Sequence, residues 1–119
     1  TNGVYGKGTD NVSAPTAPGN YLVVVNLKDE TIEVIDAAVY LIGDCVGGYD
    51  AAKPENKFTS GTDVTITKAL SAGDLRIHVA SPTGKIEFRG TGNDQARVNV
   101  AAGSHTIVLN FKDGTGSVQ

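Results

Sequence analysis

Residues 17–34, APGNYLVVVNLKDETIEV, contain the pattern that decides the fold. A dense β-branched run over residues 20–27 leads into the polar pair Lys28 and Asp29, and a second strand-like run follows over residues 31–35. Stiff β-branched side chains suit pleated strands, and a short polar break between two such runs is typical of a turn. This stretch therefore predicts two strands joined by a Lys-Asp turn.

The same motif returns near the other end of the chain, where residues 101–118 read AAGSHTIVLNFKDGTGSV. A shift of 84 positions superimposes residues 5–34 on residues 89–118 without a gap, and 11 of the 30 pairs are identical. Self-similarity at a fixed distance is typical of tandem repeats. The chain is then expected to hold the tail of a preceding repeat unit, residues 1–34, and one complete β-sandwich module, residues 35–119. Two hairpins that share only common strand-and-turn composition are the alternative.

Other short strands are expected outside this hairpin, and residues 1–19 and 44–57 are expected to form turns and a loop. Alternation in residues 74–80, DLRIHVA, places Leu75, Ile77 and Val79 inward, with Arg76 and His78 outward. Val108 and Phe111 are expected to join the buried residues. The remaining expected strands cover residues 38–42, 63–68, 85–89, 98–100 and 104–111. Eight or nine short strands between Gly- and Pro-bearing turns predict an all-β fold, an antiparallel immunoglobulin-like β-sandwich.

The composition of the 119 residues excludes several classes of protein. A formal net charge of −3 offers no basic surface to nucleic acid, and no stretch approaches the roughly 18 apolar residues of a membrane helix. The single Cys45 excludes an intrachain disulfide and a cysteine zinc site. No histidine lies in a catalytic or metal-binding motif, and the Gly-flanked acids lack the ligand density of a calcium loop. We therefore expect no enzyme activity, no metal and no cofactor.

Several pieces of the chain, taken in order, resemble the carbohydrate-binding modules of the SusE/SusF family, surface lipoproteins of starch-utilisation systems. The resemblance rests on AVYLIGDCVGGYDAA (38–52), SAGDLRI (71–77), IEFRGTGND (86–94) and VNVAAGSHTIVLNFKDGTGSV (98–118). VYGKGTDN (4–11) and residues 17–34 match the last two pieces a second time. The resemblance implies a β-sandwich outside the outer membrane that binds polysaccharide without catalysis.

The resemblance also implies where a sugar would bind. Tyr49 stands where the family usually has the Trp of its GGWD motif, Arg76 stands where it often has Lys, and Phe88 matches an aromatic position. In the family the loop aromatic and the strand cation lie close together, so we expect Tyr49 and Arg76 to approach each other with the ring partly exposed. The chain has no Trp, which leaves starch specificity open.

Sugar binding needs a flat aromatic face for the C–H side of a pyranose and planar polar groups for its hydroxyls. Tyr49 and Phe88 are the candidates for the face, and Arg76 and His78, adjacent on one strand face, are the candidates for the hydroxyls. Each has a structural alternative. The Tyr ring then covers one end of the core, the two cations are solvated, and Phe88 packs inward.

Two functions from different classes follow. The first is a non-catalytic glycan-binding module of an outer-membrane lipoprotein at the cell surface, with a polysaccharide, foremost a glucan, and other modules of the same chain as partners. The second is a structural or adhesive spacer module of a cell-surface protein, which the absence of Trp favours. Neither reading includes a nucleic-acid partner or membrane insertion by this chain.

Overall fold

The computed structural model describes residues 3–8, 11–80, 85–88 and 98–119, with the backbone alone for Gly3, Ala80 and residues 85–88. This part of the chain is all-β, apart from two short 3₁₀ helices, η1 (Asp44–Val46) and η2 (Pro54–Asn56). The strands are β1 (Gly3–Gly6), β2 (Tyr21–Asn26), β3 (Thr31–Asp36), β4 (Val39–Ile42), β5 (Val64–Leu70), β6 (Gly73–Ala80), β7 (Lys85–Phe88), β8 (Val98–Val100), β9 (Gly103–Asn110) and β10 (Thr115–Val118).

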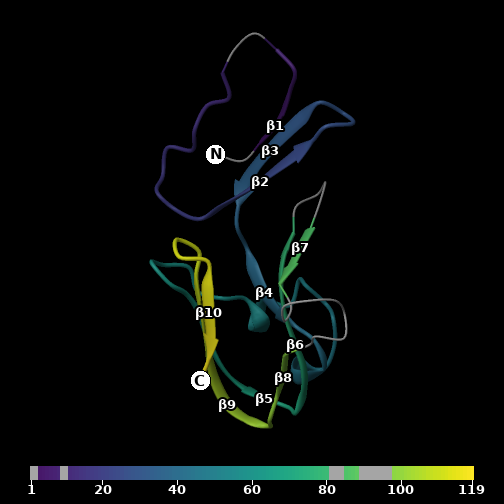
Figure 1. Cartoon of the computed structure of the whole chain (residues 1–119), viewed down its shortest axis with the longest axis vertical. Coiled ribbons are helices and arrows are strands. Elements are labelled where there is room, and N and C mark those ends of the chain that lie inside the picture. The colour runs from purple at the N-terminus through teal and green to yellow at the C-terminus, as the bar shows by residue number, and fades with distance from the viewer. Residues whose placement is uncertain (1–2, 9–10, 81–84, 89–97) are drawn as a thin grey trace.

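Two antiparallel sheets face each other in the larger part of the molecule (Figure 1). One has the order β10-β9-β5, and the other has the order β4-β6-β7, with β8 pairing a different stretch of β6. Their inner faces meet because inward residues alternate along each strand. The core contains Val39, Leu41, Val64, Ile66, Leu70, Leu75, Ile77, Val79 and Ile107. The predicted antiparallel β-sandwich is therefore confirmed.

A third sheet, with the order β1-β3-β2, lies beyond one end of the sandwich (Figure 1). Its β2 contributes Leu22 to the buried cluster of the sandwich, so the N-terminal segment contacts the module that follows it. The molecule is consequently long, measuring 53 × 29 × 25 Å. Strands β1 and β10 were not predicted, because glycines at residues 3, 6 and 116 weaken the strand pattern there.

Three of the five predicted core residues are buried as expected: Leu75, Ile77 and Val79. Phe111 is 38% exposed, so its predicted burial is wrong; it lies beyond the last residue of β9, in the turn. Val108 is only half-buried, because neighbouring residues of a strand point to opposite faces and Ile107 takes the position toward the core.

The two sequence copies fold into matching hairpins. In the first, Asn26 pairs with Thr31 across the turn, and in the second Asn110 pairs with Thr115, each 84 positions on. The Oδ1 atom of Asn26 accepts the backbone N–H of Asp29 at 3.1 Å, and that of Asn110 accepts the backbone N–H of Asp113 at 2.9 Å. The prediction that both copies form a strand running into a Lys-Asp turn is confirmed.

Candidate functional site

A closed loop at the end of β4 places Tyr49. The backbone N–H of Gly43 donates to the Gly48 carbonyl at 2.7 Å, and the N–H of Gly48 donates back at 2.9 Å. Between them, η1 is followed by its C-terminal cap Gly47, whose φ of +77° is the left-handed conformation that glycine adopts without strain. Tyr49 directly follows Gly48, so the hydrogen-bonded Gly43–Gly48 pair fixes the position of its backbone.

The loop is pressed against the start of β6, and two glycines permit this approach. A Cβ on Gly43 would lie 2.2 Å from the carbonyl oxygen of Asp74, and one on Gly73 would lie 2.8 Å from the Cβ of Asp44. The carbonyl of Cys45 also accepts the backbone N–H of Ser71 at 2.9 Å. The loop therefore carries Tyr49 to the outer face of β6.

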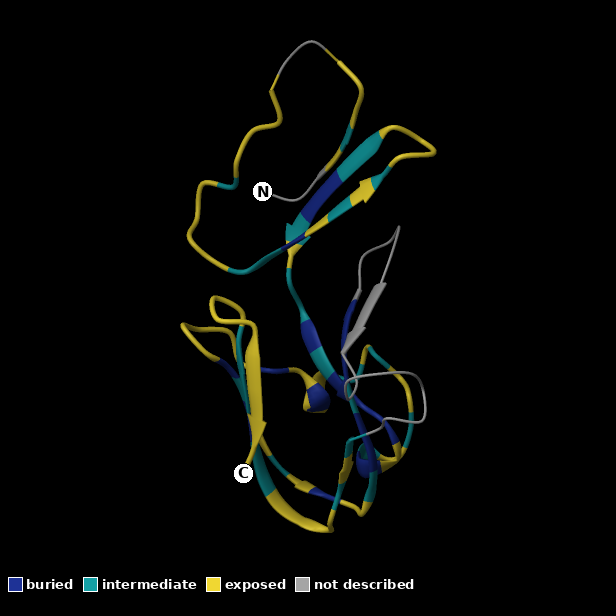
Figure 2. Ribbon diagram, viewed as in Figure 1, coloured by how far each residue is buried: buried dark blue, intermediate teal, exposed yellow. Residues whose placement is uncertain are grey.

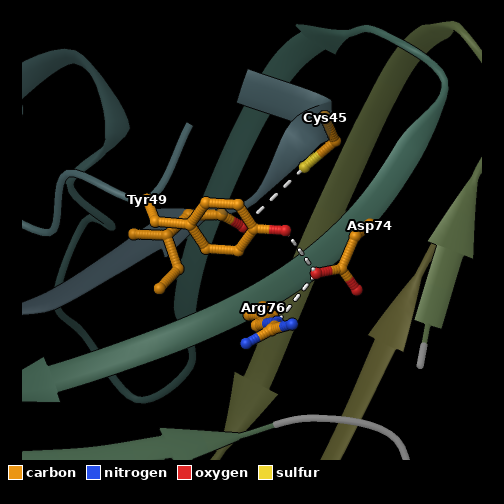
Figure 3. A network of polar contacts seen from close by, with 5 residues as sticks. Cys45, Tyr49, Asp74 and Arg76 are labelled. Carbon is orange, nitrogen blue, oxygen red and sulfur yellow. Dashed lines mark hydrogen bonds and ion pairs between the residues drawn. The ribbon is translucent and has the colours of Figure 1, made fainter. Parts of the chain in front are cut away.

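Tyr49, Asp74 and Arg76 form one polar cluster there (Figure 3). The Tyr49 hydroxyl donates to Oδ2 of Asp74 at 2.9 Å, and Nε of Arg76 donates to the same oxygen at 2.7 Å. The Cζ atom of Arg76 lies 5.0 Å from the centre of the Tyr49 ring, within cation–π distance. Asp74 and Arg76 are largely buried, whereas Tyr49 is 47% exposed. The ring is thus held on its buried side and half open to solvent.

Asp74 contributes to raising the pKa of two neighbouring groups, the Tyr49 phenol and the Cys45 thiol. The hydrogen bond to Asp74 raises the pKa of Tyr49, because the carboxylate binds the neutral phenol and repels the phenolate. Burial, together with the negative charge of Asp74, raises the pKa of the nearby Cys45 thiol to about 11. The thiol is protonated at neutral pH and is therefore a poor nucleophile.

The structure brings together Tyr49 and Arg76, as predicted, and adds Asp74. The sequence signal for Asp74 is its position two residues before Arg76 on one strand, which places both on the same face. Phe88 lies opposite Ile77 in the β6–β7 register, and its side chain is outside the described residues. Its assignment to the site stays a prediction.

The predicted outward exposure of His78 is wrong. This residue is 7% exposed, because β6 runs between β4 and β7 and the face away from the core is covered as well. In the register His78 lies between Tyr40 and Glu87. His78 is therefore buried and does not line the surface beside Tyr49.

The half-exposed Tyr49 ring is the part of this cluster that a ligand can reach from solvent. A Tyr ring with one side open can stack on the C–H face of a sugar ring. Across the described ranges, no three His, Cys, Asp or Glu side chains gather as ligands for a metal ion. No helix in the same ranges is long and apolar enough to cross a membrane.

An antiparallel sandwich that holds a half-exposed aromatic side chain at its surface is an architecture that carbohydrate-binding modules can use. The model of the family described as SusF/SusE starch-specific carbohydrate-binding modules matches residues 38–117. The chain belongs to this family, which confirms the resemblance seen in its motifs. Because the family consists of binding modules, the module is non-catalytic.

A curated relative supports the same assignment. The chain is 34% identical to the outer membrane protein SusF of Bacteroides thetaiotaomicron over 124 aligned positions. The alignment covers 85% of this chain and 25% of the relative, so the chain spans about a quarter of that protein's length.

Proposed function

We propose that this chain binds a polysaccharide, with a starch-type glucan as the first choice, as part of an outer-membrane lipoprotein at the cell surface. The family description and the name of the SusF relative support this choice of ligand and location. The observation that carries the proposal is the half-exposed ring of Tyr49, which directly follows the closed loop and is held by Asp74 and Arg76.

Each member of the cluster has a distinct role in this proposal. The Tyr49 ring supplies the stacking surface, and its hydroxyl oxygen, which donates its proton to Asp74, still has lone pairs to accept a sugar hydroxyl. Arg76 lies against the ring and anchors the carboxylate that holds it. Phe88 remains a proposed contact. His78, being buried, has only an indirect role in the proposed site.

The first prediction concerns Tyr49→Ala. Loss of a stacking aromatic costs roughly 1–3 kcal/mol by analogy with base stacking, and about 1.4 kcal/mol corresponds to a tenfold change in affinity. We expect binding to weaken at least tenfold, measured by migration in native gels that contain starch, xyloglucan, β-glucan or mannan. Circular dichroism should show an unchanged fold, because the side chain is half exposed.

Phe111→Ala is the matched control, since Phe111 is an exposed aromatic residue in the turn between β9 and β10. The Phe111→Ala variant should be slowed in polysaccharide-containing gels as strongly as the unaltered chain. Equal binding by Tyr49→Ala and Phe111→Ala would remove Tyr49 from the site. If the unaltered chain migrates freely in every gel, the spacer function is favoured in place of glycan binding.

A further inference from the structure

The turn between β9 and β10 contains the one place in the sequence where an aspartate precedes a glycine, Asp113–Gly114. Gly114 has a φ of +66°, and a Cβ built on it would meet no atom of the described chain within 4 Å. The turn and the whole of β10 are exposed to solvent (Figure 2). Because glycine carries no side chain, its backbone nitrogen is the least shielded of any residue that could follow an aspartate.

The first hairpin holds the matching aspartate differently. Asp29 lies 84 positions before Asp113 and is followed by Glu30 instead of glycine. Nδ2 of Asn26 donates to Oδ2 of Asp29 at 2.9 Å. A hydrogen bond to a carboxylate is stronger than one between neutral groups, because the acceptor is charged. The carboxylate of Asp29 is therefore held by the asparagine of its own turn.

In the second hairpin the equivalent asparagine is engaged elsewhere. Oδ1 of Asn110 accepts the backbone N–H of Asp113, as in the first hairpin, but Nδ2 of Asn110 donates to Oδ1 of Asp63 at 3.1 Å. Within the described residues, no hydrogen bond or ion pair reaches the carboxylate of Asp113. This carboxyl group can therefore rotate toward the backbone nitrogen of the residue that follows it.

We propose that Asp113 is a site of spontaneous isomerisation to isoaspartate. The backbone nitrogen of Gly114 attacks Cγ of the protonated carboxyl group, a C–N bond forms, and the amide hydrogen leaves with the carboxyl hydroxyl as water. Water then opens the cyclic imide. Attack at Cγ restores aspartate, whereas attack at the main-chain carbonyl carbon of Asp113 leaves the main chain running through Cγ. The water that is lost is regained, and no other reactant is consumed.

The isomerised turn has one main-chain atom more than the original. Thr115 of β10 lies opposite Asn110 of β9, so the extra atom falls inside the turn that sets this register. Strand β10 is the edge of its sheet, whereas β9 is also paired with β5 along its length. We therefore expect isomerisation to loosen β10 and to leave the pairing of β9 with β5 intact. This inference is independent of glycan binding at Tyr49.

Ageing of the 119-residue chain in warm neutral buffer tests the proposal. Isoaspartate is located by digestion, methyl transfer with protein isoaspartyl methyltransferase, and mass spectrometry of the peptides. We expect isoaspartate at residue 113 to accumulate at least about tenfold faster than at residue 29, which corresponds to about 1.4 kcal/mol in the barrier. Peptide mapping separates this signal from that of Asn2, which also precedes a glycine.

Two exchanges separate the effect of the dipeptide from that of the surrounding fold. Glu30→Gly gives both turns the dipeptide Asp-Gly, and residue 29 should still isomerise several-fold more slowly than residue 113, because Asn26 holds its carboxylate. Gly114→Glu should lower the rate at residue 113 to about that of residue 29. Circular dichroism checks that each variant is folded before ageing begins.

Asp113→Glu is the matched control for the effect on β10. Its longer side chain disfavours closure of the imide, and the backbone N–H that Asn110 accepts is kept. After equal ageing, the β10 amides should have lost protection from hydrogen exchange in the isomerised fraction of the unaltered chain and should have kept it in Asp113→Glu. The amides of β5 and β9 that pair with each other should stay protected in both.

Three results would overturn the proposal. If isoaspartate at residue 113 does not exceed that at residue 29 in the unaltered chain, the second turn is not a modification site. If residue 29 in Glu30→Gly isomerises as fast as residue 113, the free carboxylate is not what distinguishes the two turns. If the β10 amides of the isomerised chain stay as protected as those of Asp113→Glu, the longer turn does not loosen the strand.

Discussion

A single carboxylate oxygen, Oδ2 of Asp74, organises the candidate site. It accepts hydrogen bonds from both Tyr49 and Arg76, so the aromatic ring and the cation meet through it. Alternation along β6 predicts that Asp74 and Arg76 share a face. The alternation pattern does not predict which loop crosses that face. The contact of Tyr49 with Asp74 depends on the close approach of Gly43 to β6. The resemblance predicted the pairing of Tyr49 with Arg76, and the structure adds the group between them.

The second prediction concerns Cys45 at alkaline pH. Its pKa is raised from 9.0 to about 11 in the folded chain, so folding favours the protonated thiol. The stabilising contribution is complete below pH 9 and is lost as the pH rises through 11. From the linkage relation, we expect the free energy of unfolding to fall by about 2 kcal/mol between pH 9 and 11 through this group.

Urea unfolding at several pH values measures this contribution by comparison with Cys45→Ala. Lysine and tyrosine titration affects both proteins, so the difference between the two curves isolates the thiol. The substitution should lower stability at pH 8 and flatten the decline above pH 9. If the free energy of unfolding falls with pH in the same way in both proteins, the Cys45 thiol is not the cause of the decline.

At the level of elements, strands with alternating side chains were predicted to within about two residues, as for β6 and β9. Strands β1 and β10 were missed because their glycines remove the side chains on which the pattern depends. The loop after β4 was predicted as a loop, but its closure by the Gly43–Gly48 pair was not. That closure rests on backbone hydrogen bonds, which side-chain patterns do not report.

The third prediction concerns the closed loop and compares two of its glycines. Gly43→Ala combines a φ of +121° with a Cβ placed 2.2 Å from a carbonyl oxygen. Strain and overpacking each cost about 1–3 kcal/mol, so we expect a loss of about 2–6 kcal/mol in urea unfolding. Gly47→Ala has a φ of +77° and open space around its Cβ, and should cost about 1–2 kcal/mol. Equal losses for both would show that the close approach to Asp74 is unimportant.

The fourth prediction concerns the turn of the first hairpin. Glu30 has a φ of +53°, and its counterpart in the second hairpin is Gly114, with a φ of +66°. Glu30→Gly should therefore relieve strain and stabilise the chain by about 1 kcal/mol. The ion pair of Glu30 with Lys7 is exposed on both sides and is worth little.

The reverse exchange, Gly114→Glu, serves as the matched control. It should destabilise the second hairpin by a similar amount, and hydrogen exchange in β2 and β9 would assign each effect to its own hairpin. A loss of stability with Glu30→Gly would show that the Lys7 contact outweighs the backbone strain.

Across the whole molecule, the alternation of apolar residues predicts the sandwich. The same alternation does not predict how far the outer faces of the sheets are exposed to solvent. His78 illustrates the limit. Alternation places it away from the Leu75–Ile77–Val79 face, and that placement agrees with the register, yet the outer face is covered and the residue is buried. Period-two patterns assign residues to faces, whereas burial depends on which distant segments cover each face.

The fifth prediction concerns the core. Ile77 is 7% exposed and lies on the inner face of the central strand β6. Ile77→Ala should lower the free energy of unfolding by about 2–5 kcal/mol, the sum of the lost transfer energy and the cavity. Val25→Ala, at a residue 58% exposed, should change it by less than about 0.5 kcal/mol in the same urea titration. Equal losses of unfolding free energy for Ile77→Ala and Val25→Ala would show that Ile77 is not part of the core.

The closed loop of residues 43–48 has a consequence for the thermodynamics of recognition. Its backbone pair, its contact with Ser71 and the hydrogen bond from Tyr49 to Asp74 hold the aromatic ring of the candidate site in the ligand-free chain. A protein surface that is already ordered loses little conformational entropy on association, so the entropic penalty falls mainly on the flexible ligand. Calorimetry on oligosaccharides that are progressively stiffened should therefore show affinity rising with ligand rigidity.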